Sequence, residues 1–244
     1  MNIALLGTGF GQAHAAVYAQ RPDVDEVDEV GVFGRDSQKL ADISQRFGFA
    51  TTTDLNAVIA DASVDLVDSC LPTNLHAKVA VQAMHAGRDV LIEVPLAATV
   101  EDARHVVAVQ RHTGQRALVD MFSRFSLAHL LLTQAASDQR YGPLKVLEID
   151  GRSALIRPGY QLTLKTLALD MLHSDFDLVT GLLGKPGTVG VIGTDGPVGR
   201  GSAATVILGY RDAFVRCASS SLMPTPRFAA AGARPSPARC SNTP

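Results

Sequence analysis

The chain has 244 residues, which is enough for one large domain or two modest ones with a sizeable core. Its formal net charge of −2 and 19% charged residues give no indication of a nucleic-acid or acidic-membrane partner. Its three cysteines form no close pair, and its seven histidines show no paired ligand spacing, so neither a disulfide framework nor a metal site is indicated. Because no leader and no apolar run of about 20 residues is present, we expect a cytoplasmic protein.

The first half of the chain alternates short apolar runs with amphipathic stretches. Such alternation predicts strands joined by crossover helices, and therefore a doubly wound parallel sheet over residues 1–120. The predicted strands are Asn2–Leu6, Val27–Phe33, Asp65–Ser69, Asp89–Ile92 and Arg116–Asp120. The predicted helices are Gln12–Gln20, Ser37–Phe47, Leu75–Ala86 and Thr99–His112.

The pattern changes after Asp120 and indicates a smaller α+β domain over residues 121–221. Helices are predicted at Leu127–Ser137 and roughly Thr166–Leu183, and strands at Leu144–Asp150, Ala204–Tyr210 and Ala213–Ser219. The last two strands are separated by the short spacing of a hairpin.

The composition changes again in residues 222–244, which contain five prolines, five alanines and three arginines but no Asp, Glu or Lys. No hydrophobic periodicity remains, so we expect this tail to be disordered. A natural disordered tail and translation in a shifted reading frame would both produce such a composition.

A glycine-rich turn lies between the first predicted strand and the first helix. Glycines allow a tight turn and a close approach of the backbone to a pyrophosphate, and the helix N-terminus then supplies free N–H groups. The spacing is imperfect, because the third glycine is one residue early, and the turn could also serve only to pack helix on strand. Its position favours dinucleotide binding. The predicted residues are Gly7, Thr8, Gly9, Phe10, Gly11 and Gln12.

The end of the second strand bears on the choice between NAD and NADP. An acidic residue there would bind the ribose 2′-hydroxyl, whereas an arginine would accommodate a 2′-phosphate. The position where an acidic residue would be expected is occupied by Gly34, and Arg35 follows it. Ser37 could donate a further hydrogen bond. We therefore expect NADP in preference to NAD. Alternatively, Ser37 is only a helix cap and Arg35 a solvated charge, and a register shifted by two would place Asp36 at the acidic position.

Four later segments, together with the glycine turn, resemble the Gfo/Idh/MocA family of oxidoreductases, named for glucose–fructose oxidoreductase and inositol dehydrogenase. They are Leu71–His76, Gly87–Leu96, Met121–Phe125 and Asp170–Asp177. The resemblance runs from Met1 to about Leu222. It implies an N-terminal Rossmann domain, a substrate domain and a nicotinamide cofactor.

The resemblance also implies roles for individual residues. The loop from Leu71 would line the cofactor, Glu93 would lie near the nicotinamide ribose, and Arg124 would lie at the domain junction. The lysine of the family's Glu-Lys-Pro signature, which is taken to assist proton transfer, is replaced by Val94. Helix capping by Asn74 and a satisfied core histidine at His76 are the structural alternatives. The expected cofactor-lining residues here are Leu71, Pro72, Thr73, Asn74, His76, Glu93, Val94 and Arg124.

The predicted helix around residue 170 resembles the family's Asp-x-x-x-His-x-x-Asp motif, with the histidine one residue early. At about 100° per residue, His173 and Ser174 lie to either side of Asp170, and Asp177 lies about 20° from it. We expect Asp170 and His173 to perform acid–base catalysis, and all four residues to face substrate. The alternative is a helix held by polar contacts at a domain interface. Lys165 projects from a different side of a continuous helix.

Together these features predict hydride transfer between NADP(H) and a CH–OH or ketone carbon of a small polyhydroxylated substrate. A non-catalytic dinucleotide-binding regulator and an inactive truncated relative are the alternatives, and both are favoured by Val94. The family's substrate domain has further strands after Ser219, so we expect an incomplete domain whose sheet ends in an unpaired edge. The homo-oligomer that is typical of the family is therefore doubtful here.

Overall fold

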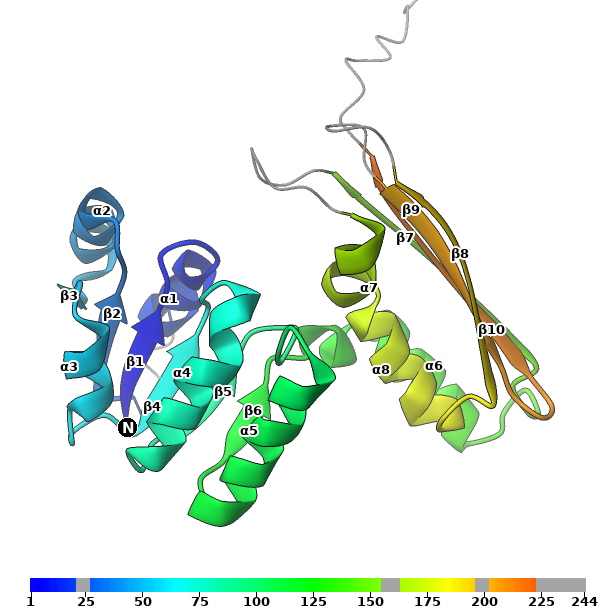
Figure 1. The fold of residues 1–244 in the computed structure, drawn as a ribbon, viewed down its shortest axis with the longest axis horizontal. Coiled ribbons are helices and arrows are strands. Elements are labelled where there is room, and N and C mark those ends of the chain that lie inside the picture. The colour runs from blue at the N-terminus through cyan, green and yellow to red at the C-terminus, as the bar shows by residue number, and fades with distance from the viewer. Residues whose placement is uncertain (21–26, 155–162, 196–201, 223–244) are drawn as a thin grey trace, which may run out of the picture. The chain divides into compact units, whose positions relative to one another are not determined.

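The computed structural model describes residues 1–20, 27–154, 163–195 and 202–222 (Figure 1). These residues form two compact units. The first contains residues 1–143 and 176–182, and the second contains residues 144–175 and those from 183 onward. The division differs from the boundary expected at residue 120, because the segment up to residue 143 belongs to the first unit. In the described part of the chain, no helix has the length and apolar character needed to cross a membrane.

The first unit is built on a six-stranded parallel sheet with the order β3-β2-β1-β4-β5-β6. This order reverses direction between β1 and β4, as in a doubly wound sheet, so the predicted fold class is confirmed. The short strand β3 was not predicted. The strands are β1 Asn2–Leu6, β2 Glu29–Phe33, β3 Ala50–Thr52, β4 Leu66–Ser69, β5 Asp89–Ile92 and β6 Ala117–Val119.

Local capping explains where the helices of this unit begin and end. Asp36 accepts hydrogen bonds from two backbone N–H groups at the start of α2, and Gly48 closes that helix in the left-handed conformation. Thr99 and Gly114 cap α5 in the same way. The helices are α1 Gly11–Gln20, α2 Ser37–Phe47, α3 Leu55–Ala60, α4 Thr73–His85, α5 Val100–Thr113, the 3-10 turn η1 Phe122–Phe125 and α6 Leu127–Ser137.

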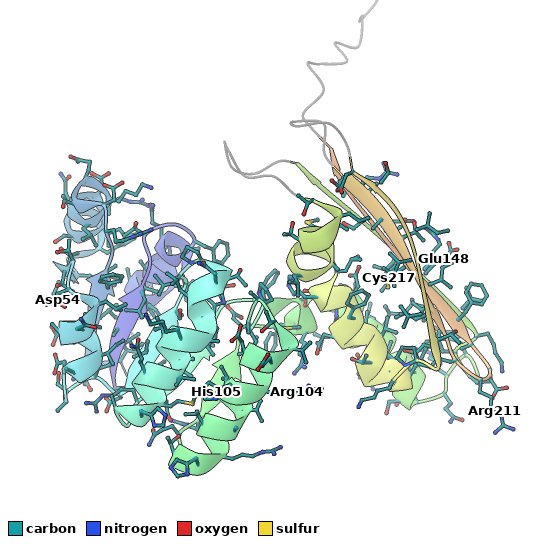
Figure 2. All side chains as sticks on the ribbon, in the orientation of Figure 1. Asp54, Arg104, His105, Glu148, Arg211 and Cys217 are labelled. Carbon is teal, nitrogen blue, oxygen red and sulfur yellow. The ribbon has the colours of Figure 1, made fainter. Side chains whose placement is uncertain are left out.

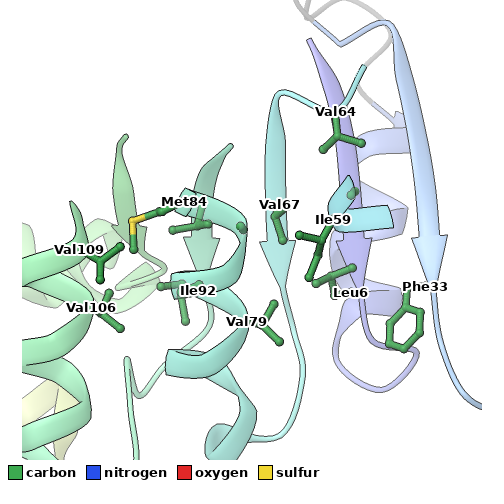
Figure 3. Packing of buried hydrophobic residues seen from close by; sticks show 14 residues of the cluster. Leu6, Phe33, Ile59, Val64, Val67, Val79, Met84, Ile92, Val106 and Val109 are labelled. Carbon is green, nitrogen blue, oxygen red and sulfur yellow. The ribbon is translucent and has the colours of Figure 1, made fainter. Parts of the chain in front are cut away.

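Both faces of this sheet are buried because successive side chains along each strand point in opposite directions. Ile3 and Leu5 of β1 pack with side chains of α1 and α2. Ala4 and Leu6 pack on the other face with side chains from α3, α4 and α5, including Met84 (Figure 3). The unit therefore has a hydrophobic core on each side of its sheet.

The second unit contains a four-stranded sheet with the order β7-β10-β9-β8. The predicted hairpin is confirmed as the antiparallel pair β9 and β10, whereas β8 was not predicted. Cys217 of β10 lies on the face toward α7, and Glu148 of β7 lies on the opposite face (Figure 2). The strands are β7 Val146–Ala154, β8 Thr188–Asp195, β9 Ser202–Gly209 and β10 Phe214–Leu222.

The long helix predicted near residue 170 is two helices, α7 Leu164–Met171 and α8 His173–Leu183, separated at Leu172. The prediction of one continuous helix was therefore wrong, and angles measured along one helix do not hold across Leu172. A buried leucine side chain at this position anchors the junction. Hydrophobic periodicity continued through the junction, so no pattern in the sequence indicated the break.

The last described strand, β10, lies inside the second sheet, between β7 and β9. The edges of the described sheet are β7 and β8, so the chain's last described strand is not itself an edge, and the expectation that the sheet ends in an unpaired edge stays a prediction. Residues 223–244, on which the prediction of a disordered tail rests, lie outside the described residues.

Candidate dinucleotide site and the adjacent charged cluster

The glycine turn joins β1 to α1 at the point where the strand order reverses. Gly7 has φ +114°, and a Cβ added there would lie 2.6 Å from the carbonyl oxygen of Cys70. Gly7 also donates its N–H to the carbonyl oxygen of Phe33 at 2.9 Å. The position therefore requires glycine, because a side chain would be both strained and in collision.

The middle of the turn has the space that a phosphate needs. A Cβ added at Gly9 would meet no atom within 4 Å, and α1 begins two residues later at Gly11. The Gln12 side chain donates to the carbonyl oxygen of Thr8 at 2.9 Å and so holds the turn closed. An open glycine before a helix N-terminus fits the pyrophosphate of a dinucleotide.

Gly34, at the end of β2, where an acidic residue would read the ribose, has no room for a side chain. A Cβ added at Gly34 would lie 2.4 Å from the methyl carbon of Thr8. Asp36 accepts hydrogen bonds from the backbone N–H groups of Gln38 and Lys39 as the N-cap of α2. Asp36 is thus engaged as a helix cap, and Arg35 is exposed.

The loop that precedes α4 is held by His76, which is fully buried. Its Nδ1 lies 2.8 Å from the carbonyl oxygen of Pro95, and its Nε2 lies 2.6 Å from that of Leu71. His76 therefore holds two loops together, which agrees with the alternative that it is a histidine whose hydrogen bonds are satisfied within the fold. The capping alternative for Asn74 was wrong, because α4 begins at Thr73 without a side-chain cap and Asn74 is exposed.

A charged cluster lies at the carboxyl edge of the same sheet, centred on His14 of α1. Its Nδ1–H donates to Asp68 Oδ2 at 2.8 Å, and its Nε2–H donates to Glu93 Oε1 at 2.8 Å. Asp120 Oδ2 lies 3.6 Å from the same Nε2. The hydroxyl of Tyr18, one helical turn after His14, donates to Asp68 Oδ2 at 2.7 Å. One imidazole thus connects the ends of three parallel strands.

The protonation states of this cluster follow from its contacts. Hydrogen bonds to Asp68, and further ones to Cys70 and Glu93, raise the pKa of His14 to about 12, so the ring is an imidazolium at neutral pH. Burial raises the pKa of Cys70 to about 11 and also raises that of Tyr18, so both groups are neutral. The cluster therefore contains one cation among its carboxylates.

Histidine, cysteine and carboxylate atoms that could bind a metal also meet here. Ligand atoms of His14, Cys70 and Glu93 lie within 4.8 Å of one another. In this structure both ring nitrogens of His14 lie within hydrogen-bonding distance of carboxylate oxygens. The arrangement is that of an ion-pair network. Sequence reasoning missed it, although the i, i+4 spacing of His14 and Tyr18 on one helix face was a usable signal.

Glu93 connects this cluster to the loop that carries Val94. Its Oε1 accepts from His14, and its Oε2 accepts the backbone N–H of Val94 at 3.1 Å. The valine side chain has no group that can exchange a proton. Glu93 is therefore held from both sides at the position where the family resemblance implies the nicotinamide ribose.

Of the two predicted catalytic residues, the structure describes the side chain of His173 only. The Nδ1–H of His173 donates to the carbonyl oxygen of Leu169 at 2.9 Å, and its Nε2 is buried without a hydrogen-bond partner among the described residues. The side chain of Asp170 lies outside the described residues, so its expected role in orienting His173 is untested. Ser174 follows His173 in the first turn of α8.

Two residues expected to face ligands form an ion pair with each other. Arg124 donates from Nε and Nη2 to the two carboxylate oxygens of Asp177 at 2.7 and 2.6 Å. This bidentate pair raises the pKa of the Arg124 guanidinium. It connects η1 to α8 within the first unit.

An open parallel sheet with a glycine turn at its reversal point defines a Rossmann-type nucleotide-binding domain. Residues 1–121 match the Gfo/Idh/MocA family, described as "Oxidoreductase family, NAD-binding Rossmann fold". The chain belongs to this oxidoreductase family through that half, as the resemblance predicted.

Individual relatives support this assignment. The chain is 34% identical over 131 residues to 4-carboxy-2-hydroxymuconate-6-semialdehyde dehydrogenase of Sphingobium sp. (strain NBRC 103272 / SYK-6), with 53% of this chain and 41% of the relative covered. It is 27% identical over 187 residues to inositol 2-dehydrogenase of Rhizobium meliloti (strain 1021), with 76% and 56% covered. The chain thus spans about half the length of these relatives.

Solved structures share the fold. The structure of biliverdin reductase from Synechocystis sp. PCC 6803, in complex with biliverdin and NADP+, superposes with a TM-score of 0.78 at 20% identity. The match covers 93% of this chain and 73% of that chain. An identity of 20% shows a shared fold only, and the match extends over residues of both units.

Proposed function

We propose that this chain binds a nicotinamide dinucleotide and transfers hydride to or from a CH–OH or ketone carbon of a small sugar, polyol or inositol-like substrate in the cytoplasm. The observation that carries the proposal is the turn at the reversal point of the sheet, where Gly7 permits no side chain and Gly9 opens onto free space before α1. The substrate class is inferred from relatives such as inositol 2-dehydrogenase.

We further propose NADP as the preferred cofactor. Thr8 occupies the space into which a side chain at Gly34 would extend, and Asp36 is engaged as a helix cap. No carboxylate from these positions repels a 2′-phosphate, and the exposed guanidinium of Arg35 can bind it. A charge-assisted hydrogen bond contributes about 1.5–3 kcal/mol, so NADPH should bind about ten- to a hundredfold more tightly than NADH.

His173 is the proposed proton acceptor. Since its Nδ1–H donates to the Leu169 carbonyl, the neutral ring carries its lone pair on Nε2. The nicotinamide cofactor would be held at the turn of Gly7 and Gly9 and would supply the hydride-transfer chemistry at the substrate carbon. Nε2 of His173 takes the hydroxyl proton as the carbonyl forms, and it returns that proton in the reverse direction. In this proposal the Leu169 carbonyl orients His173.

Cofactor binding can be tested without turnover. Wild type, Gly9→Ala and Arg35→Ala should be titrated with NADPH and NADH by calorimetry, with thermal melts of each variant. Gly9→Ala should retain its melting temperature, because its methyl group enters free space, but should bind both cofactors weakly. Arg35→Ala should lose affinity for NADPH only. If wild type binds neither cofactor, the proposed function is wrong.

Catalysis is tested by a panel of keto-sugars and inosones with NADPH, using wild type and His173→Ala. We expect His173→Ala to reduce kcat by about 10²–10⁴-fold with the Kd for NADPH unchanged. Val94 in place of the family's lysine favours one alternative, a non-catalytic dinucleotide-binding regulator. Tight cofactor binding without turnover on any member of the panel would support that regulator.

A further inference from the structure

Three carboxylates lie at the ends of three neighbouring strands. Asp68 is in β4, Glu93 follows β5 directly, and Asp120 follows β6 directly. These strands form the second half of the sheet, which in doubly wound dinucleotide-binding folds holds the second mononucleotide. Among the described residues, the ion pairs of all three carboxylates are made with His14.

The cluster has an excess of negative charge. Three carboxylates face one imidazolium, and the remaining members of the cluster, Tyr18 and Cys70, are neutral. The most accessible carboxylate is Asp120, whose side chain is 28% exposed, whereas that of Asp68 is fully buried. Asp120 is therefore the carboxylate that a ligand at this edge can approach.

The two forms of a nicotinamide cofactor differ in charge where they would meet this edge. The oxidised ring carries a positive charge, and the reduced ring is neutral. A carboxylate near the ring attracts the first and not the second. Aside from the ring, the two forms present the same phosphates and riboses, so their affinity ratio isolates the charge at the nicotinamide half of the site.

We propose that the cluster of Asp68, Glu93 and Asp120, tied together by His14, selects the redox state of the cofactor by making the chain bind the oxidised form more tightly than the reduced form. This inference rests on the proposed function, because it requires a bound nicotinamide dinucleotide. Asp120 is the specificity-determining residue, and His14 is a positioning residue that holds the carboxylates at the strand ends.

The experiment compares dissociation constants of NADP+ and NADPH, and in parallel those of NAD+ and NADH, at pH 8. Wild type is compared with Asp120→Asn, which removes one charge with little change of shape. Asp61→Asn is the matched control, since Asp61 is an exposed carboxylate before β4, at the opposite edge of the sheet. Thermal melts confirm that each variant is folded.

We expect wild type to bind the oxidised form more tightly. Asp120→Asn should shift the ratio of the two dissociation constants toward the reduced form by about threefold or more, because it removes one of the negative charges that attract the oxidised ring. Asp61→Asn should leave the ratio unchanged. A ratio that stays within twofold of wild type in Asp120→Asn would overturn the inference while leaving the proposed function intact.

The pH dependence provides a second measurement. Burial, followed by the repulsion of Glu93, raises the pKa of Asp120 above its ordinary value. The selectivity of wild type should therefore decrease as the pH falls through that pKa, and Asp120→Asn should show no such decrease. The surrounding titratable groups are His14, Tyr18, Asp68, Cys70 and Glu93. A wild-type ratio that is constant down to pH 4 would contradict the inference, whereas failure to bind either form would refute the proposed function itself.

Discussion

The two sheets of this protein each carry an ion network, and the two networks differ in burial. On the six-stranded sheet, His14 joins Asp68 and Glu93 at the carboxyl edge, where its side chain is only 13% exposed. On the four-stranded sheet, Arg216 of β10 pairs with Glu148 and Asp150 of β7 on the open face. Both networks join neighbouring strands, but only the first is shielded from water, so similar contacts should have very different energetic effects.

The largest expected effect is on the buried network. We predict that His14→Gln lowers the free energy of unfolding by about 3–5 kcal/mol, because Asp68 and Glu93 would remain buried without their cation. Urea denaturation followed by circular dichroism measures this change. A loss below about 1 kcal/mol would mean that the buried network behaves like an exposed one.

The glycine turn gives the next largest effect. We predict that Gly7→Ala destabilises the chain by about 2–4 kcal/mol, since alanine would be strained at φ +114° and its Cβ would lie 2.6 Å from the Cys70 carbonyl oxygen. Gly9→Ala is the matched control, with open space at the Cβ position. Equal melting temperatures for the two variants would contradict the prediction, because they would show that the backbone around Gly7 moves to admit a Cβ without loss of stability.

The buried network should also make stability depend on pH. The pKa of His14 is raised from 6.5 in the unfolded chain to about 12 in the folded chain, so its contribution is complete below pH 6.5 and is lost as the pH rises toward 12. The loss is at most about 1.4 kcal/mol per pH unit. Unfolding midpoints from pH 6 to 10 should fall in wild type and fall less steeply in His14→Gln. Parallel curves would contradict the prediction.

The smallest effect is expected for the exposed network. Arg216→Gln should change the melting temperature by at most a few degrees, because water and salt screen its contacts with Glu148 and Asp150. The shift should vanish in about 1 M NaCl, whereas that of His14→Gln should persist. A salt-resistant loss in Arg216→Gln would mean that the open face is covered in solution.

Elements whose signals are local could be predicted from the amino-acid sequence. Asn2–Leu6 and Ser37–Phe47 were predicted with the bounds that the structure shows, because apolar periodicity and the caps Asp36 and Gly48 act within a few residues. The glycine turn was recognised for the same reason, since its position between a strand and a helix can be read from the chain. The short strand Ala50–Thr52 was missed because only pairing with β2 makes it a strand.

The charged cluster and the pairing within the helix motif of the second half depend on contacts between residues that are distant in sequence. His14 meets Asp68 and Glu93 across 54 and 79 residues of sequence, and only the parallel sheet brings those strand ends to one helix. Arg124 and Asp177 pair across 53 residues, although each was expected to face a ligand. The break at Leu172 likewise depends on packing, because a buried leucine can end one helix and begin another without changing the periodicity. Local patterns determine which elements form, whereas contacts between distant residues determine which polar groups remain available for chemistry.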